Sequence, residues 1–190
     1  LRKEFLDADS WEMGDNFKSP QRTIFTISTG YPNKGLHVLI RSLQLVRNVF
    51  PDVKLNIGGY FVPTGIKQSG YERWIVRLIS ALRLTDAVNF LGPLKADEVV
   101  KQLQTSAVFV NPSFVESYSV AFAEALKIGI PCVVAFSGAM PELAINERDA
   151  LFFSPGDHYG CARQIIKLFE YPEFSQTLSL NARLNISQYC

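Results

Sequence analysis

Apolar runs of strand length alternate along this chain with segments of helical periodicity. The apolar runs fall at residues 23–28, 53–57, 88–91, 107–110, 131–135 and 151–153. Between residues 71 and 82 apolar side chains recur three or four positions apart, which is the pattern of an amphipathic helix. Strands that alternate with helices predict repeated β–α–β units around a parallel sheet, and the continuous apolar strands indicate a sheet buried on both faces. The expected fold is a doubly wound, Rossmann-like α/β domain.

Capping and helix-ending residues between these runs indicate where the expected helices begin and end. Asp97 and Asp157 are expected to cap helices over residues 97–103 and 157–169, because aspartate favours the N-cap position. Residues 118–128 form a nearly all-apolar helix that ends at Gly129. Residues 1–20 show no clear period, and we interpret them as a linker or approach to a domain formed by residues 21–190.

Composition excludes several classes of protein. Of the 190 residues 47% are hydrophobic and 19% charged, as in globular domains, and a net charge of +1 gives no electrostatic case for nucleic acid as a partner. No apolar run approaches the roughly 18 residues of a membrane-spanning helix. Three widely spaced cysteines show no metal-ligand spacing and suit the reducing cytoplasm. Because the chain begins with leucine rather than methionine, we expect it to be part of a longer protein.

Some conspicuous side chains are expected to be structural. Trp11 and Trp74 are interpreted as packing residues, and Cys132, inside an apolar strand, as an inert core thiol. His37 and His158 have no metal partners in the sequence pattern and are expected on the surface near helix starts.

The chemistry is expected at one edge of the sheet. In folds of this kind ligands bind outside the carboxyl ends of the strands. Four loops have that position, at residues 29–35, 58–65, 92–97 and 111–119.

The most informative stretch is residues 114–126, FVESYSVAFAEAL. Glu124 lies within the apolar helix, where an ionised carboxylate is costly unless it is paired or hydrogen-bonded. Glu116 lies in the loop just before the helix. Free N–H groups of Ser117 to Ser119, with the helix dipole, would hold an anion such as a diphosphate between two carboxylates that accept sugar hydroxyls. The residues alone leave open a plainer reading, in which Glu116 is a solvated loop residue and Glu124 an ordinary ion-pair partner.

The same stretch, followed by GIPCVV at residues 129–134, resembles the glutamate–x7–glutamate motif of retaining GT-B glycosyltransferases, particularly the family 4 group. The resemblance extends over about residues 23–169 and includes KG at 34–35, FLG at 90–92, NPS at 111–113 and SGAMPE at 137–142. It implies that Glu116 contacts the donor sugar and Glu124 holds the ribose hydroxyls. Backbone groups of Ser117, Tyr118 and Ser119 would face the donor.

Lys34 is the second candidate for chemistry. It stands in a Gly/Pro/Asn loop between a strand and a helix, where its ammonium can neutralise a phosphate as a point charge, although a loop lysine is more often simply solvated. The family usually has an arginine about five residues earlier; Thr29 stands there, and its hydroxyl can donate one hydrogen bond. Further donor-binding positions are expected at Gly30, Gly59, Pro93 and Leu94.

The resemblance implies the donor-binding, C-terminal half of a glycosyltransferase that transfers a hexose from a nucleotide-diphosphate sugar with retention. Glu116 and Lys34 are the expected catalytic groups, and neither a metal nor another cofactor is expected. The acceptor, a glycan or lipid-linked group, would be bound by an N-terminal domain absent from this chain, so the chain alone should turn over little. Polysaccharide assembly in the cytoplasm is implied, with attachment to the inner face of the membrane as a further option. The alternatives are a sugar-nucleotide epimerase of GT-B architecture and a non-catalytic nucleotide-binding module.

Overall fold

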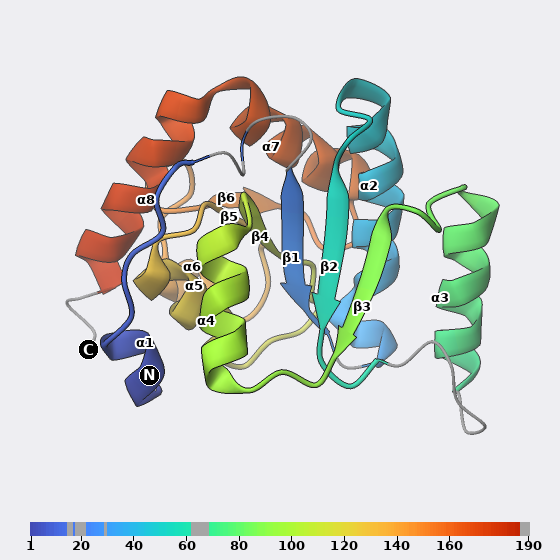
Figure 1. Ribbon diagram of the computed structural model, residues 1–190, viewed down its shortest axis with the longest axis horizontal. Coiled ribbons are helices and arrows are strands. Elements are labelled where there is room, and N and C mark those ends of the chain that lie inside the picture. Colours follow the sequence, from blue (N-terminus) through green and yellow to red (C-terminus); the bar gives the residue numbers. More distant parts are fainter. Residues whose placement is uncertain (15–16, 18–21, 29, 62–68, 187–190) are drawn as a thin grey trace.

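One parallel sheet organises the chain. The computed structural model describes residues 1–14, 17, 22–28, 30–61 and 69–186, and within these ranges six strands pair in the order β3-β2-β1-β4-β5-β6 (Figure 1). Every neighbouring pair is parallel. The strands agree with the predicted apolar runs to within one or two residues. They are β1 (Thr23–Ile27), β2 (Lys54–Gly58), β3 (Val88–Gly92), β4 (Val108–Asn111), β5 (Cys132–Ala135) and β6 (Leu151–Phe153).

Helices cover both faces of the sheet, which confirms the doubly wound α/β prediction (Figure 1). α2 and α7 pack together on one face, whereas α4 and α5 cover the other and are joined there by α1 and α8. None of the helices in the described ranges is both long and apolar enough to span a membrane. The helices are α1 (Lys3–Leu6), the 3-10 turn η2 (Pro32–Lys34), α2 (Leu36–Val49), α3 (Gly70–Ala81), α4 (Ala96–Thr105), α5 (Val120–Ile128), α6 (Met140–Leu143), α7 (His158–Glu170) and α8 (Pro172–Ile186).

The two predicted aspartate caps have different outcomes. Asp157 caps α7 as expected, since its carboxylate accepts a hydrogen bond from the Gly160 N–H at 2.9 Å. Asp97 does not cap α4, and that prediction is wrong. The N-cap is Lys95, whose backbone N–H is bound at 2.7 Å by the carboxylate of Glu98. Asp97 lies in the first turn, where a negative charge still complements the helix dipole.

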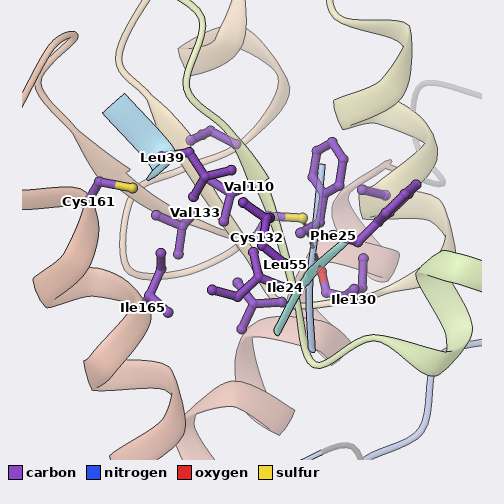
Figure 2. Close-up of a cluster of buried hydrophobic side chains, with 14 of the residues drawn as sticks. Ile24, Phe25, Leu39, Leu55, Val110, Ile130, Cys132, Val133, Cys161 and Ile165 are labelled. Atoms are coloured by element: carbon purple, nitrogen blue, oxygen red, sulfur yellow. Dashed lines mark hydrogen bonds between the residues drawn. The ribbon is translucent and has the colours of Figure 1, made fainter. Parts of the chain in front are cut away.

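The core is built between the sheet and the flanking helices. Leu39 of α2 and Ile165 of α7 belong to the same buried cluster as Val110 and Val133 of the central strands (Figure 2). Cys132 is fully buried, as predicted, and burial raises the pKa of its thiol far above the ordinary value. A thiol held in its neutral form is a poor nucleophile, so this cysteine has a packing role.

The N-terminal segment is part of this core rather than a separate tether. Phe5, Trp11 and Phe17 are 0%, 4% and 7% exposed and belong to the same hydrophobic cluster as the sheet. The backbone N–H of Trp11 donates to the Ile128 carbonyl at 2.7 Å, and its indole Nε1–H donates to the Ser106 carbonyl at 2.8 Å. The described part of residues 1–20, which were expected to be a linker or an approach to the domain, is therefore docked on it. Widely spaced aromatic anchors leave no periodic signal, which is why the sequence pattern did not reveal this docking.

Candidate functional site

The strand order places the topological switch point of the sheet between β1 and β4. The chain leaves β1 toward β2 on one side, whereas β4 continues the sheet on the other side, so the connections diverge between β1 and β4. Ligands of open α/β sheets bind at such a switch point, outside the carboxyl ends of the strands. The loop after β1 carries η2, and the loop after β4 leads to the N-terminus of α5.

Three loops meet at this edge. The Phe114 N–H, after β4, donates to the Asn33 carbonyl after β1 at 2.8 Å. The Ser137 hydroxyl, after β5, donates to the Ser113 carbonyl at 2.8 Å. The Ala139 N–H donates to the Glu116 carbonyl at 3.2 Å. The loop that carries Glu116 is therefore held on both sides by its neighbours.

Two glycines make this close approach possible. Gly35 has φ +69°, and a β-carbon there would lie 1.9 Å from the Pro112 carbonyl oxygen. Gly138 has φ +53°, and a β-carbon there would lie 1.5 Å from the Glu116 carbonyl oxygen. Because only glycine combines a left-handed backbone with no side chain, these positions fix how tightly the loops that carry Lys34 and Glu116 can pack.

Lys34 and Glu116 meet at the switch point. The Lys34 ammonium donates to the two carboxylate oxygens of Glu116 at 2.9 and 3.0 Å, although the residues are 82 positions apart. Their side chains are 27% and 14% exposed, respectively. The structure thus brings together the two residues expected to act in catalysis, and neither is an isolated solvated side chain. The Lys34 side chain is still partly exposed, and the third N–H of its ammonium can bind a further acceptor.

Glu124 is paired with a residue that the sequence did not indicate. Its side chain is 1% exposed, and Arg2 donates to it twice, from Nε to Oε1 at 2.7 Å and from Nη2 to Oε2 at 2.9 Å. The hydrogen bond to Glu124 is the main cause that raises the pKa of the Arg2 guanidinium. A buried carboxylate was expected to need a partner, and Arg2 is that partner. The expected ribose contact of Glu124 stays a prediction.

The start of α5 differs from the prediction by two residues. The helix begins at Val120, and Ser119 is its N-cap: the serine hydroxyl accepts from the Phe122 N–H at 3.2 Å and from the Asn111 amide at 2.9 Å. Ser119 is therefore buried and engaged, whereas Ser117 and Tyr118 are exposed in the preceding loop. Serine competes effectively for the cap position, which shifts the helix start past the apolar Tyr118.

The remaining predicted positions lie at other loops of the same edge. Gly59 has φ +114° and packs so closely on Ser28 that a β-carbon would lie 2.2 Å from the Ser28 carbonyl oxygen. Leu94 packs over Gly58, and Pro93 is exposed beside it. Gly30 lies against the side chain of Glu72 at the start of α3. Thr29 lies outside the described residues.

An aromatic cluster flanks the Lys34 loop, and the sequence patterns did not reveal it. His37 stacks on Phe114 with ring centroids 5.6 Å apart, and its Nδ1 lies 2.9 Å from the Tyr71 hydroxyl. Trp74 completes the group and packs as expected, although 42% of it is exposed. His37 was expected on the surface, but it is half-buried. Burial, and secondly the charge of Arg41, lower the pKa of its imidazole.

The family model for glycosyl transferases group 1 matches residues 8–185. The chain belongs to this family. Sulfoquinovosyl transferase SQD2 of Arabidopsis thaliana is 24% identical over 193 residues, which cover 95% of this chain and 35% of the relative. The chain therefore spans about a third of that protein's length.

Solved structures share the fold. HepE from Anabaena in complex with UDP-glucose superposes with a TM-score of 0.80 at 24% identity, over 87% of this chain and 44% of that one. The C-terminal domain of LpcC, a glycosyl transferase group 1 family protein from Francisella tularensis, superposes with a TM-score of 0.77 at 14% identity, over 88% of this chain and 85% of that one. At these identities the likeness concerns the fold alone, a Rossmann-like α/β domain with a six-stranded parallel sheet.

Proposed function

We propose that this chain is the donor-binding, C-terminal domain of a retaining glycosyltransferase of the family 4 type, whose donor is a nucleotide-diphosphate sugar. The observation that carries the proposal is the contact of Lys34 with Glu116 at the switch point of the sheet, 2.9 Å between Nζ and Oε1. It joins a cation suited to a phosphate and a carboxylate suited to sugar hydroxyls within one ion pair. The LpcC neighbour, which is itself described as a C-terminal domain, supports the proposed placement in a longer enzyme.

In this proposal the two groups act on opposite sides of the bond that breaks. Lys34 donates to the diphosphate and stabilises the charge that develops on it as it leaves, because a preorganised cation is most effective where charge appears in the transition state. Glu116 accepts hydrogen bonds from hydroxyls of the transferred sugar. We propose that this sugar is a hexose, as in a UDP-glucose-type donor. The third N–H of the Lys34 ammonium, which Glu116 does not use, donates to the diphosphate. The chain supplies no acceptor site in this proposal, and a second domain would bind the acceptor.

The nucleoside is proposed to lie on the side of Glu124, with Gly59, Pro93 and Leu94 toward the base. No metal is required, because Lys34 and backbone N–H groups meet the phosphates. Both oxygens of Glu124 now accept hydrogen bonds from Arg2. A carboxylate retains lone pairs beyond these two bonds, so ribose hydroxyls would share Glu124 with Arg2. We propose a cytoplasmic role in polysaccharide assembly, at the inner face of the membrane where the acceptor is lipid-linked.

A thermal-shift screen of the chain tests this function. UDP-, GDP- and ADP-sugars are compared with the matching nucleoside diphosphates and nucleosides. For one of the three bases, the nucleoside diphosphate and the diphosphate sugar should raise the melting temperature. A ligand at about 100 times its Kd stabilises the folded state by about 2.7 kcal/mol. If no nucleotide at millimolar concentration shifts the transition, the proposal is wrong. Product analysis of the longer protein, with and without acceptor, then separates transfer from epimerisation.

A further inference from the structure

Each glutamate of the motif holds a cation, and in both pairs the cation is the more exposed partner. Lys34 is 27% exposed against 14% for Glu116, and Arg2 is 45% exposed against 1% for Glu124. A molecule that approaches from solvent therefore meets a positive group first at either carboxylate. The proposed function uses Lys34 but leaves Arg2 without a role.

The guanidinium of Arg2 has hydrogen-bonding capacity to spare. Arginine carries five N–H donors in a planar fork, and Glu124 occupies one on Nε and one on Nη2. Among the described residues, no other hydrogen-bond acceptor of Arg2 is present beyond Glu124. One face of the guanidinium lies over the Phe5 ring, 4.8 Å from its centroid, so the remaining donors lie along the free edge of the fork.

Arg2 is held in place by the N-terminal arm, residues 1–14, of which it is part. Phe5 is fully buried, and α1 packs against α4 and α5 (Figure 1). The Trp11 backbone hydrogen bond to Ile128 fastens the following residues to the end of α5. Figure 1 shows α1 toward the end of the sheet at which the strand arrows point, the same end as the loops that carry Lys34 and Glu116. α1 thus lies toward the carboxyl edge, and the guanidinium of the preceding Arg2 is held by Glu124 and by the Phe5 ring.

We propose that Arg2 is a ligand-binding residue, which donates from its free edge to a phosphate oxygen of the nucleotide diphosphate while Glu124 positions it. This proposal rests on the proposed function. In a nucleotide the first phosphate is one ribose away from the hydroxyls that Glu124 is proposed to hold, so a guanidinium bonded to Glu124 has to reach across one sugar to meet it. The planar fork suits phosphate oxygens, and an arginine remains charged at any physiological pH. Lys34 and Arg2 then bind the diphosphate from two sides.

Titration calorimetry with a nucleoside diphosphate and with the matching nucleoside tests the role of Arg2. Arg2→Ala should weaken the diphosphate at least tenfold and the nucleoside less than threefold, and the difference should shrink at high salt. Arg2→Lys keeps a cation beside Glu124 but loses the fork, so it should fold like the parent and recover only part of the affinity. Lys3→Ala is the matched control, because it removes an exposed cation from the next position. It should bind like the parent.

Each other outcome has a distinct meaning. Equal losses for both ligands in Arg2→Ala and Arg2→Lys would show that Arg2 only supports Glu124, and tighter binding would show that Arg2 blocks the site; both overturn the proposal. If the parent binds nucleotide and the Arg2 variants bind it equally well, the Arg2 proposal fails and the proposed function stands. If the parent binds no nucleotide, both fail together.

Discussion

At the scale of single residues, the environment of a side chain decides its charge. His37 is half-buried between Phe114, Tyr71 and Trp74, with Arg41 nearby. Burial disfavours the charged imidazole most, and the positive charge of Arg41 adds to this effect, so the pKa of His37 is lowered. The folded protein therefore binds a proton at His37 less readily than the unfolded chain does.

His37 should make stability depend on pH. Because its folded pKa lies below the unfolded value of about 6.5, its contribution is fully present above that pH and is lost as the pH falls toward the folded pKa. His37→Gln, which does not titrate, should show a smaller loss of unfolding free energy between pH 7.5 and pH 5 than the parent. Urea titrations across this range measure both slopes. Identical slopes would show that His37 has the same pKa in the folded and unfolded states, which would contradict this account.

At residue level, the predicted fold explains one contact of the candidate site. Lys34 and Glu116 each follow a strand, and adjacent parallel strands bring their carboxyl ends together, so their meeting follows from the fold. The partner of Glu124 could not be found in this way. Arg2 stands 122 positions from Glu124, in a segment without periodicity, and only the docking of Phe5 brings it there.

At the scale of elements, glycines set the spacing of the loops that carry the site. Gly138 begins the turn before α6 and touches the backbone of Glu116, whereas Gly70 in the first turn of α3 has no atom within 4 Å of its missing β-carbon. The two positions therefore form a matched pair of glycines with opposite structural demands.

Gly138→Ala should destabilise the protein and weaken donor binding. The left-handed backbone costs an alanine about 1–2 kcal/mol, and displacement of the Glu116 carbonyl adds to that cost. Gly70→Ala should be neutral or slightly stabilising, because alanine favours the helix. Unfolding free energies from urea titration compare the two. Equal effects would contradict the close packing of these loops.

Element prediction failed where the buried face of a helix is not apolar. α8 buries Leu178 and Ala182, but also Ser175 and Ser179. The buried Ser175 hydroxyl has a hydrogen-bond partner, since it donates to the Leu168 carbonyl at 2.8 Å. Small polar residues on the buried face remove the hydrophobic period on which the prediction depends. The strands are continuous apolar runs and α3 has a strong helical period, so the sequence placed these elements to within one or two residues.

At the scale of the whole molecule, the N-terminal arm and the sheet domain form one hydrophobic cluster. Domains of this size usually unfold in a single transition. Because the aromatic anchors of the arm are as buried as the strands, the arm should unfold together with the sheet rather than before it.

Phe5→Ala tests whether the N-terminal arm unfolds together with the sheet. Loss of a fully buried phenylalanine should lower the unfolding free energy by about 3–5 kcal/mol. The control is Leu6→Ala, which alters a 48% exposed neighbour on α1 and should change stability by less than about 0.5 kcal/mol. Far-UV circular dichroism and tryptophan fluorescence should report one coincident transition in the parent. Equal effects of the two substitutions, or an early separate transition, would show an arm independent of the domain.

The central claim is that Lys34 binds the diphosphate of a nucleotide-diphosphate sugar and Glu116 binds its sugar. Calorimetry on three proteins tests this claim most directly. The parent, Lys34→Ala and Glu116→Gln are titrated with the nucleoside, its diphosphate and the diphosphate sugar that the screen identifies. Lys34→Ala should cost about 1–3 kcal/mol for both phosphate-bearing ligands and leave the nucleoside unchanged. Glu116→Gln should reduce affinity for the diphosphate sugar relative to the diphosphate and the nucleoside, since it weakens a sugar contact. If both variants bind all three ligands like the parent, this ion pair is not the donor site.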